Sequence, residues 1–372
     1  MRARTLAAVL SLTLAVAPAT PAHAVALPAW DHPGYDAEDS YYNPHETAIN
    51  LGTIAGLTRR WSVPLRKRPG GACAGFSKPL VAGGRVIVTD QLGIGAYLPL
   101  TGAPAWRFTW PDPLDTETPY LAADGSTLIA ATSGCNSQSD PDGIIFAVDL
   151  TTGRLRWRAD PDVPVYSLAV DKGMAVIAGV SPSDEQAVIA YRVADGRVAW
   201  QKPGYDSSGV SANGRLLVTN ARSTSAVSII SGVPLWTKKA VWRAEAATPA
   251  SDRFLVTNGE SLSAVSAAFG ALLWTAPAAA STLLATDGRR VYRAAGNTVE
   301  ALNAANGRRL WSRSLPKEAG QPVRAGGLLY VGGPILSPAT GAVLRPTTAG
   351  PSIVTGGRLY TANQGILSSY GT

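Results

Sequence analysis

The segment Ala147-Val148-Asp149-Leu150-Thr151-Thr152-Gly153-Arg154-Leu155-Arg156-Trp157 is the clearest copy of a phrase that occurs seven times in the sequence. In every copy a glycine stands four residues before the last motif position, and in six copies an alanine stands six residues before that glycine. The glycines are Gly102, Gly153, Gly196, Gly232, Gly270, Gly307 and Gly341, and the motif ends on Trp106, Trp157, Trp200, Trp236, Trp274, Trp311 and, in the last copy, Arg345. A repeat of this kind sets the fold and has to be interpreted before any single residue.

Each copy has the properties of a β-hairpin. Phe146, Val148 and Leu150 alternate as in a strand, and a pair such as Thr152-Gly153 provides a tight turn in which glycine takes a positive φ. The tryptophan that ends the second strand carries a large ring that must be buried. We therefore expect each ring, including that of Trp61 ahead of the first copy, to dock on the next copy.

A second pattern gives the number of copies. A short turn followed by an apolar strand occurs eight times, at Gly83-Gly84, Asp124-Gly125, Lys172-Gly173, Asn213-Gly214, Ser251-Asp252, Asp287-Gly288, Gly326-Gly327 and Gly356-Gly357. Successive motif ends are 34 to 51 residues apart, which is the length of a four-stranded, WD-like propeller blade.

The two ends of the chain supply the halves of one further blade. Residues 57–61 resemble the second strand of the hairpin phrase, but no first strand precedes them. Residues 366–370 resemble the first strand, but no second strand follows them. We therefore predict an all-β, eight-bladed β-propeller of four-stranded antiparallel blades, closed by pairing of residues 57–64 with 366–370, which removes the exposed sheet edges. Seven blades is the alternative if those segments do not pair. The propeller would span residues 57–372 and follow an N-terminal arm at 25–56.

Residues 1–24 have the features of a secretory signal peptide. Arg2 and Arg4 precede an apolar stretch, and Ala22-His23-Ala24 is a small-x-small cleavage site. Because no later run is long and apolar enough for a membrane helix, we expect a secreted protein of the extracellular or cell-envelope space, present as a monomer. The net charge of +7 is not concentrated in a Lys/Arg run, so the sequence does not favour a nucleic-acid partner.

The chain contains two cysteines, Cys73 and Cys135. Export favours their oxidation. In the predicted propeller they lie in loops that emerge on one face of neighbouring blades. We therefore expect a disulfide between them.

Residues that commonly perform catalysis are scarce. The mature chain would contain two histidines, His32 and His45, both in the arm, which argues against a histidine-based triad or metal site. Asp140 and Asp142 are closely spaced in a turn but lack the ligand spacing of a known Ca²⁺ loop. We therefore predict no catalytic residue, no metal site beyond these two weak candidates, and no bound cofactor.

The early blades are longer than the later ones, and the extra length lies in residues 109–120, 133–143 and 181–186. Insertions on one face of a repeat array often mark its binding side. The acids in them are Asp112, Asp115, Glu117, Asp140, Asp142, Asp184 and Glu185, and Trp110 is the candidate for an exposed aromatic ring, with simple packing as the alternative. An acidic patch would favour a cationic partner or a metal. The alternative is that these loops are merely solvated.

Ala147, Asp149, Thr152, Gly153 and Trp157 form a motif that resembles the tryptophan-docking repeat of quinoprotein-type propellers, the PQQ-like repeat family. The resemblance covers nearly the whole mature chain, and the other copies match in part. The enzymes of this family hold a quinone over Ca²⁺ on the propeller axis, with acidic and amide ligands, a catalytic aspartate and a disulfide between adjacent cysteines.

Cys73 and Cys135 are not adjacent, and no acid cluster matches those ligands. The resemblance therefore implies a non-catalytic scaffold that binds a protein or an envelope or extracellular polymer. A quinoprotein-like oxidoreductase that uses PQQ and Ca²⁺ is the alternative.

Overall fold

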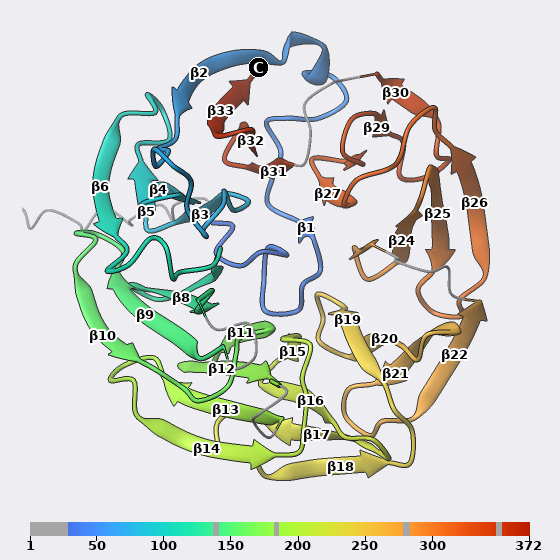
Figure 1. Ribbon diagram of the computed structural model, residues 1–372. Helices are drawn as coiled ribbons and strands as arrows, with labels where there is room; N and C mark the ends of the chain where they lie inside the picture. Colours follow the sequence, from blue (N-terminus) through green and yellow to red (C-terminus); the bar gives the residue numbers. More distant parts are fainter. Residues whose placement is uncertain (1–28, 137–140, 182–185, 278–282, 347–351) are drawn as a thin grey trace, which may run out of the picture.

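The computed structural model describes residues 29–136, 141–181, 186–277, 283–346 and 352–372. Its strands form eight sheets arranged around one axis (Figure 1). Seven sheets have four strands, and one has a fifth, short strand next to the axis. The predicted eight-bladed propeller is confirmed, and the seven-bladed alternative is excluded.

In the first seven blades, the four main strands follow one another in the chain, with the first nearest the axis and the last at the rim; in the eighth, the rim strand β2 (Thr58–Pro64) comes from the start of the propeller (Figure 1). The first blade contains β3 (Leu80–Ala82), β4 (Arg85–Asp90), β5 (Gly93–Tyr97) and β6 (Pro104–Thr109). The second to fourth contain β7 (Tyr120–Asp124), β8 (Thr127–Ser133), β9 (Gly143–Asp149), β10 (Leu155–Ala159), β11 (Ser167–Asp171), β12 (Met174–Gly179), β13 (Ala187–Arg192), β14 (Val198–Pro203), β15 (Ser211–Ala212), β16 (Arg215–Thr219), β17 (Thr224–Ser228) and β18 (Pro234–Lys238).

The fifth to seventh blades contain β19 (Arg243–Ala247), β20 (Arg253–Thr257), β21 (Ser261–Ser266), β22 (Leu272–Pro277), β23 (Leu283–Thr286), β24 (Arg290–Ala295), β25 (Thr298–Asn303), β26 (Arg309–Ser314), β27 (Val323–Ala325), β28 (Leu328–Tyr330), β29 (Ile335–Leu336) and β30 (Val343–Arg345). The eighth contains β31 (Ser352–Thr355), β32 (Arg358–Asn363), β33 (Ile366–Gly371) and β2 (Thr58–Pro64).

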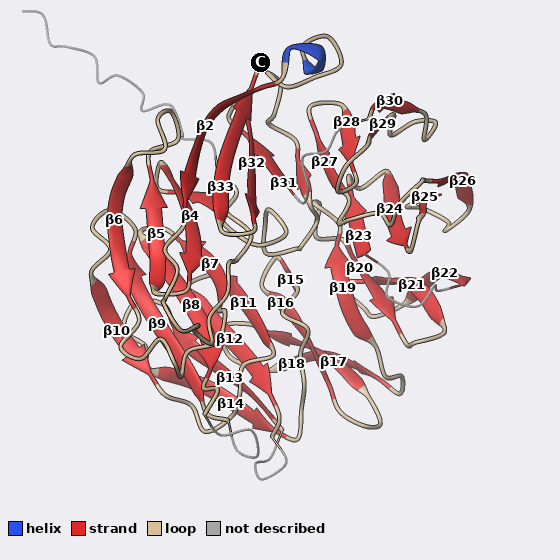
Figure 2. Ribbon diagram, turned by 45° about the horizontal axis from the view of Figure 1, so that its top comes forward, coloured by secondary structure: helices blue, strands red, loops and turns tan. Residues whose placement is uncertain are grey.

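The central strands of the blades are buried on both sides, because neighbouring blades pack face to face (Figure 2). All residues of β8 and β12 are buried, whereas β10 at the rim has none that is fully buried. The hydrophobic core is therefore divided into seams between successive blades, such as the cluster in which Ile129 and Ile145 meet Val170 and Ile177.

The ring closes in the eighth blade, where the two ends of the propeller pair. Strand β2 runs antiparallel to β33, from Thr58 opposite Gly371 to Pro64 opposite Ile366. The closure predicted from the two half-phrases is confirmed, and both strands lose an exposed edge.

At each of seven seams a motif tryptophan lies against the motif glycine of the next blade. A Cβ atom added to any of these glycines would lie 2.6–2.8 Å from a ring atom of the preceding tryptophan, and each glycine has a positive φ. The indole N–H donates to the carbonyl three residues before that glycine, at 2.8–3.1 Å, as from Trp106 to Leu150. The neighbouring blade thus both buries the ring and accepts the hydrogen bond of its N–H group.

The recurrent alanine stands opposite the tryptophan within its own blade. Ala147 pairs with Trp157, and the next pair in the ladder is shifted by a β-bulge. The same alanine–tryptophan pair occurs in five other blades, and all six alanines are fully buried. A small residue at this position leaves room for the strands of the facing blade.

The seam between the seventh and eighth blades is different. Arg345 replaces the tryptophan, and its Nη1 donates to the carbonyl of Ile54. Ile54 begins the 3₁₀ helix η1 (Ile54–Gly56) at the end of the N-terminal arm. The arm therefore contributes to the one seam that has no docked indole.

We predict that Gly153→Ala destabilises the protein more than Gly173→Ala. Both glycines have a φ above +70°, but a Cβ at Gly153 would meet Trp106 at 2.6 Å, whereas a Cβ at Gly173 has nothing within 4 Å. The left-handed backbone costs about 1–2 kcal/mol in either variant, and the overpacked seam adds about 1–3 kcal/mol in the first. Denaturant unfolding of both variants measures the difference, and equal losses would contradict the docking geometry.

Candidate functional site

The N-terminal arm lies inside the ring and winds past its inner strands (Figure 1). Its strand, β1 (Tyr42–Asn43), pairs in parallel with β27. Hydrogen bonds of 2.6–2.9 Å connect residues 30–43 to all eight blades in chain order, with partners in Val81, Ala123, Val170, Ser211, Ala247, Thr286, Arg324 and Val354. The arm thus uses the free backbone groups of the innermost strands, which would otherwise face an open channel.

The arm is compact and conformationally unusual. Tyr35, Asp39 and Tyr41 have φ values of 86°, 49° and 52°, in the left-handed region that non-glycine residues rarely adopt. Trp30 is fully buried and contacts the edge of Tyr35 at 5.2 Å between ring centroids. Such strain persists only where surrounding contacts determine the backbone, and here these contacts come from the blades.

His32 is the charged centre of the arm. Its Nδ1 lies 2.8 Å from Asp31 Oδ1, and its Nε2 lies 2.7 Å from the carbonyl oxygen of Val170. Both partners are acceptors, so the ring satisfies them only as an imidazolium that donates from both nitrogens. Burial by itself lowers the pKa of His32, but the hydrogen bond and charge of Asp31 and the Val170 carbonyl raise it to about 9.

For two aspartates of the arm, in contrast, the surroundings favour the neutral form. Burial raises the pKa of Asp36 to about 7, although Ser40 donates to the carboxylate from its backbone N–H and its hydroxyl. Burial also raises the pKa of Asp39 to about 6, against the attraction of His32 and Lys78. The axis therefore contains acids that are already committed to the arm's own conformation.

We predict that His32→Gln changes the pH dependence of stability. The folded-state pKa of about 9 lies above the ordinary 6.5, so the contribution of His32 is complete below about pH 6.5 and is lost as the pH rises through 9. The difference in free energy of unfolding between wild type and variant should shrink by about 3 kcal/mol over that range. Denaturant titrations at several pH values test this, and a constant difference would contradict a charged His32.

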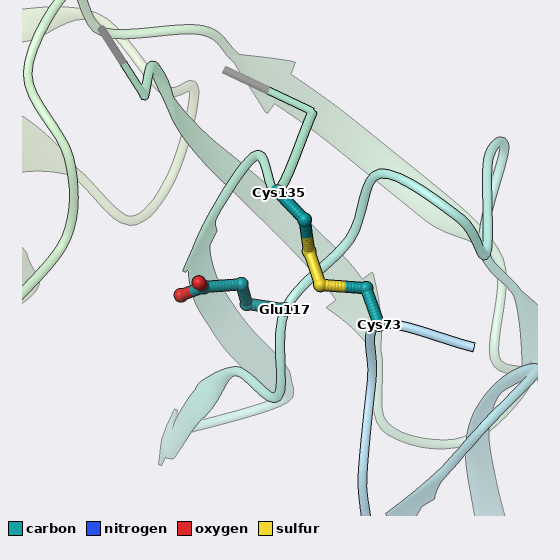
Figure 3. Close-up of side chains that lie close together, drawn as sticks. All are labelled: Cys73, Glu117 and Cys135. Carbon is teal, nitrogen blue, oxygen red and sulfur yellow. A yellow bond between two sulfur atoms is a disulfide. The ribbon is translucent and has the colours of Figure 1, made fainter. Parts of the chain in front are cut away.

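The face that carries the connections β6–β7 and β8–β9 is called the loop face. Cys73, between β2 and β3, and Cys135, between β8 and β9, form a disulfide there with Cα atoms 6.5 Å apart (Figure 3). Their loops belong to neighbouring blades, as the sequence predicted. A disulfide also fits a location outside the cytoplasm.

Glu117 lies beside this disulfide (Figure 3). One ligand atom from each of Cys73, Glu117 and Cys135 lies within 4.8 Å of the others. Metal ions bind thiolates, and both sulfurs are consumed by the disulfide, so this group cannot ligate a metal in its oxidised form.

The acids of the loop face play different parts. Asp115 Oδ1 accepts from the backbone N–H groups of Cys135 and Asn136, and Asp112 Oδ1 accepts from that of Leu114. Asp112 thus stabilises its own loop, whereas Asp115 connects the β6–β7 loop to the β8–β9 loop. Glu117 and Asp142 are exposed. Asp140, Asp184 and Glu185 lie outside the described residues.

A cavity of about 480 Å³ opens beside these loops, lined by Asp115, Asn136, Asp142, Arg158 and Asp160. Arg158 forms an ion pair of 2.6 Å with Asp160. Asp115 and Asp142 are the other acids of its lining. The structure therefore brings together three of the predicted acids, Asp115, Glu117 and Asp142, close to the disulfide.

The expectation that Trp110 might face a ligand is wrong. Its side chain is 2% exposed and packs against Phe108 and Phe146, with ring centroids 5.7 Å away in each case. Phe146 belongs to the second blade, so Trp110 closes the core between the first two blades. The alternative given for this residue, simple packing, is correct.

We predict that denatured, unreduced protein contains no free thiol. Thiol labelling after denaturation tests this, with reduced protein as the control. Replacing both cysteines by serine removes a cross-link between residues 62 positions apart and should lower the free energy of unfolding by up to about 4 kcal/mol. Two labelled thiols in unreduced protein would refute the bridge.

The fold and its docked indoles define a β-propeller built from PQQ-like repeats. A family model described as outer membrane protein assembly factor BamB matches residues 58–160, 92–224 and 220–364, which together cover most of the chain. The chain therefore belongs to this PQQ-like repeat family. No curated protein matches the chain significantly.

Solved structures share the fold at low sequence identity. BamB from Moraxella catarrhalis is 17% identical, with a TM-score of 0.62 over 85% of this chain and 98% of that one. Quinohemoprotein alcohol dehydrogenase from Comamonas testosteroni is 12% identical, with a TM-score of 0.68 over 92% and 80%. A europium-containing methanol dehydrogenase is 12% identical, with a TM-score of 0.65 over 90% of each chain. These structures include both a BamB protein and two dehydrogenases.

Among the described residues, no helix is long and apolar enough to cross a membrane.

Proposed function

We propose that the protein is an exported, monomeric, non-catalytic propeller that binds a protein or an envelope or extracellular polymer. The observation that carries this proposal is the position of the arm, which contacts all eight blades from inside the ring. The part of a propeller in which the enzymes of this fold place their cofactor is used here by the chain itself. Binding is left to the outer faces.

The residues on the axis do not fit a quinone held over Ca²⁺. The Asp36 carboxylate accepts from the N–H and hydroxyl of Ser40, and Asp39 is attracted by His32 and Lys78. A Ca²⁺ ion needs six to eight oxygen ligands, and these acids are engaged within the arm. The hydrogen bonds between the arm and the innermost strands of the blades would also have to break to make room for the cofactor.

The loop face around the Cys73–Cys135 disulfide is the proposed binding surface. The disulfide ties loops of two neighbouring blades together, so their side chains are presented in a fixed arrangement, which reduces the entropy lost on binding. Glu117 and Asp142 are exposed there. The local charge favours a partner with lysine or arginine side chains.

We predict that the double variant Glu117→Gln, Asp142→Asn captures less of the natural partner than wild type. The matched control is Glu260→Gln, Glu318→Gln, which removes two exposed acids from loops of later blades on the same face. Immobilised mature proteins would be incubated with envelope and culture-medium fractions of the producing cells. We expect the loss of two surface charge pairs to reduce the amount of captured partner about threefold to tenfold. The melting temperatures should stay unchanged.

The decrease should be largest at low ionic strength, because salt screens exposed charges. Equal capture by the two double variants at low salt would reject the acidic loop face as the binding surface.

The alternative, a quinoprotein-like oxidoreductase using PQQ and Ca²⁺, draws support from the similarity to the alcohol and methanol dehydrogenases. It is tested by incubating the mature protein with PQQ and Ca²⁺ and measuring the visible absorption and dye reduction with alcohols and sugars. The scaffold proposal expects neither a bound chromophore nor dye reduction. Stoichiometric quinone binding together with dye reduction would reject the scaffold proposal in favour of the oxidoreductase.

A further inference from the structure

A pocket of about 310 Å³ lies where the ring closes, between the first and eighth blades. It opens on the face opposite the loop face, beside the turn between β3 and β4, the hairpin between β5 and β6, and the turn between β31 and β32. Its walls are Val81, Pro99 and Leu100 from the first blade and Thr355, Arg358 and Tyr360 from the eighth. Most of this lining is apolar.

The motif residue at this seam is smaller than its counterparts in the next three blades. Pro99 occupies the motif position whose carbonyl accepts from the preceding tryptophan. The corresponding residues of the next three blades are the branched aliphatic Leu150, Val193 and Ile229, at most 6% exposed, and the other three seams have Ala267, Ala304 and Pro338. Leu150 fills its seam as far as the turn before β4, because its Cβ lies 3.3 Å from the position of a Cβ on Gly83. The smaller Pro99 leaves this volume open.

Arg358 begins β32 and provides the polar end of the pocket. Its Nη1 is buried and has no hydrogen-bond partner. The equivalent residue of the fifth blade, Arg253, forms an ion pair of 2.7 Å with Asp252 and donates to the carbonyl of Ala304 at 2.8 Å. A glycine, Gly357, stands before Arg358 in place of that aspartate.

The nearest acid of the arm does not replace the missing partner. Glu46 accepts from the backbone N–H groups of Ala48 and Ile49 with Oε1 and from that of Gly357 with Oε2. Within the described part of the chain, no carboxylate forms an ion pair with Arg358. Arg358 therefore brings to the pocket a guanidinium without an ion-pair partner among the described residues.

We propose that this seam pocket binds a carboxylate that carries an apolar group. The carboxylate pairs with Arg358, whose planar guanidinium matches the two oxygens, and the apolar group lies against Val81, Pro99, Leu100 and Tyr360. The same chemistry is presented by a small free aliphatic acid and by the C-terminal carboxylate of a peptide that ends in leucine. The proposal is independent of the loop face.

The test measures binding of two probes to the mature protein by titration calorimetry. One probe is 4-methylpentanoate, and the other is the tripeptide Gly-Gly-Leu with a free C-terminus. Each has its amide as a matched neutral control. We expect saturable binding of at least one acid, weakened tenfold or more in its amide. The probe that binds more tightly identifies the source of the carboxylate.

Three variants locate the site. Arg358→Gln should weaken binding tenfold or more, whereas Arg215→Gln, the same strand position in the fourth blade, should leave it unchanged. Pro99→Leu places in the seam the residue that the next blade has at this position, and should abolish binding without lowering the melting temperature. Should Arg358→Gln fail to fold, Pro99→Leu still decides. No saturable binding of either acid, equal binding of acid and amide, or undiminished binding by Pro99→Leu would overturn the proposal.

Discussion

The docking of an indole ring on a glycine of the next blade is the contact on which the ring depends. It requires a residue without Cβ in a left-handed turn, a carbonyl in reach of the indole N–H, and a small residue opposite the tryptophan. Seven seams meet these conditions with nearly the same geometry, so the blades repeat at a constant angle and the eighth brings β33 next to β2. The remaining seam uses Arg345 and the end of the arm in place of an indole.

The arm converts this ring from an open channel into a filled one. Its backbone bonds to six blades, and the side-chain bonds of His32 and Asn43 to the other two, tie the innermost strands together at the axis. Charged groups of the arm form the hydrogen bonds that hold the arm in this position. His32, for example, bonds to Asp31 and to the carbonyl of Val170. The surfaces left for partners are the two faces, one with disulfide-linked acidic loops and one with a pocket at the closing seam.

The fold was predictable because its signals are periodic. Glycine, alanine and tryptophan recur at fixed spacing, and the half-phrases at the ends specify closure as directly as the full copies specify the blades. The path of the arm was not predictable, since it is held largely by backbone hydrogen bonds, which leave no pattern of side chains. For Trp110 both exposure in a proline-rich loop and simple packing were open, and packing is confirmed because Phe108 and Phe146 enclose the ring. Arg358 was missed because arginine also begins the corresponding strand in four other blades, so the sequence does not set it apart.

Amide hydrogen exchange on the mature protein tests the central claim, that the arm fills the axis of the ring. The backbone N–H groups of Ala123, Ser211, Ala247, Thr286 and Arg324 point from five different blades to carbonyls of the arm, at 2.6–2.8 Å. We predict that these five amides exchange as slowly as amides between the central strands of the blades, because they open only when the arm leaves. Exchange of all five at the rate of exposed loop amides would show that the axis is open in solution and would contradict the account.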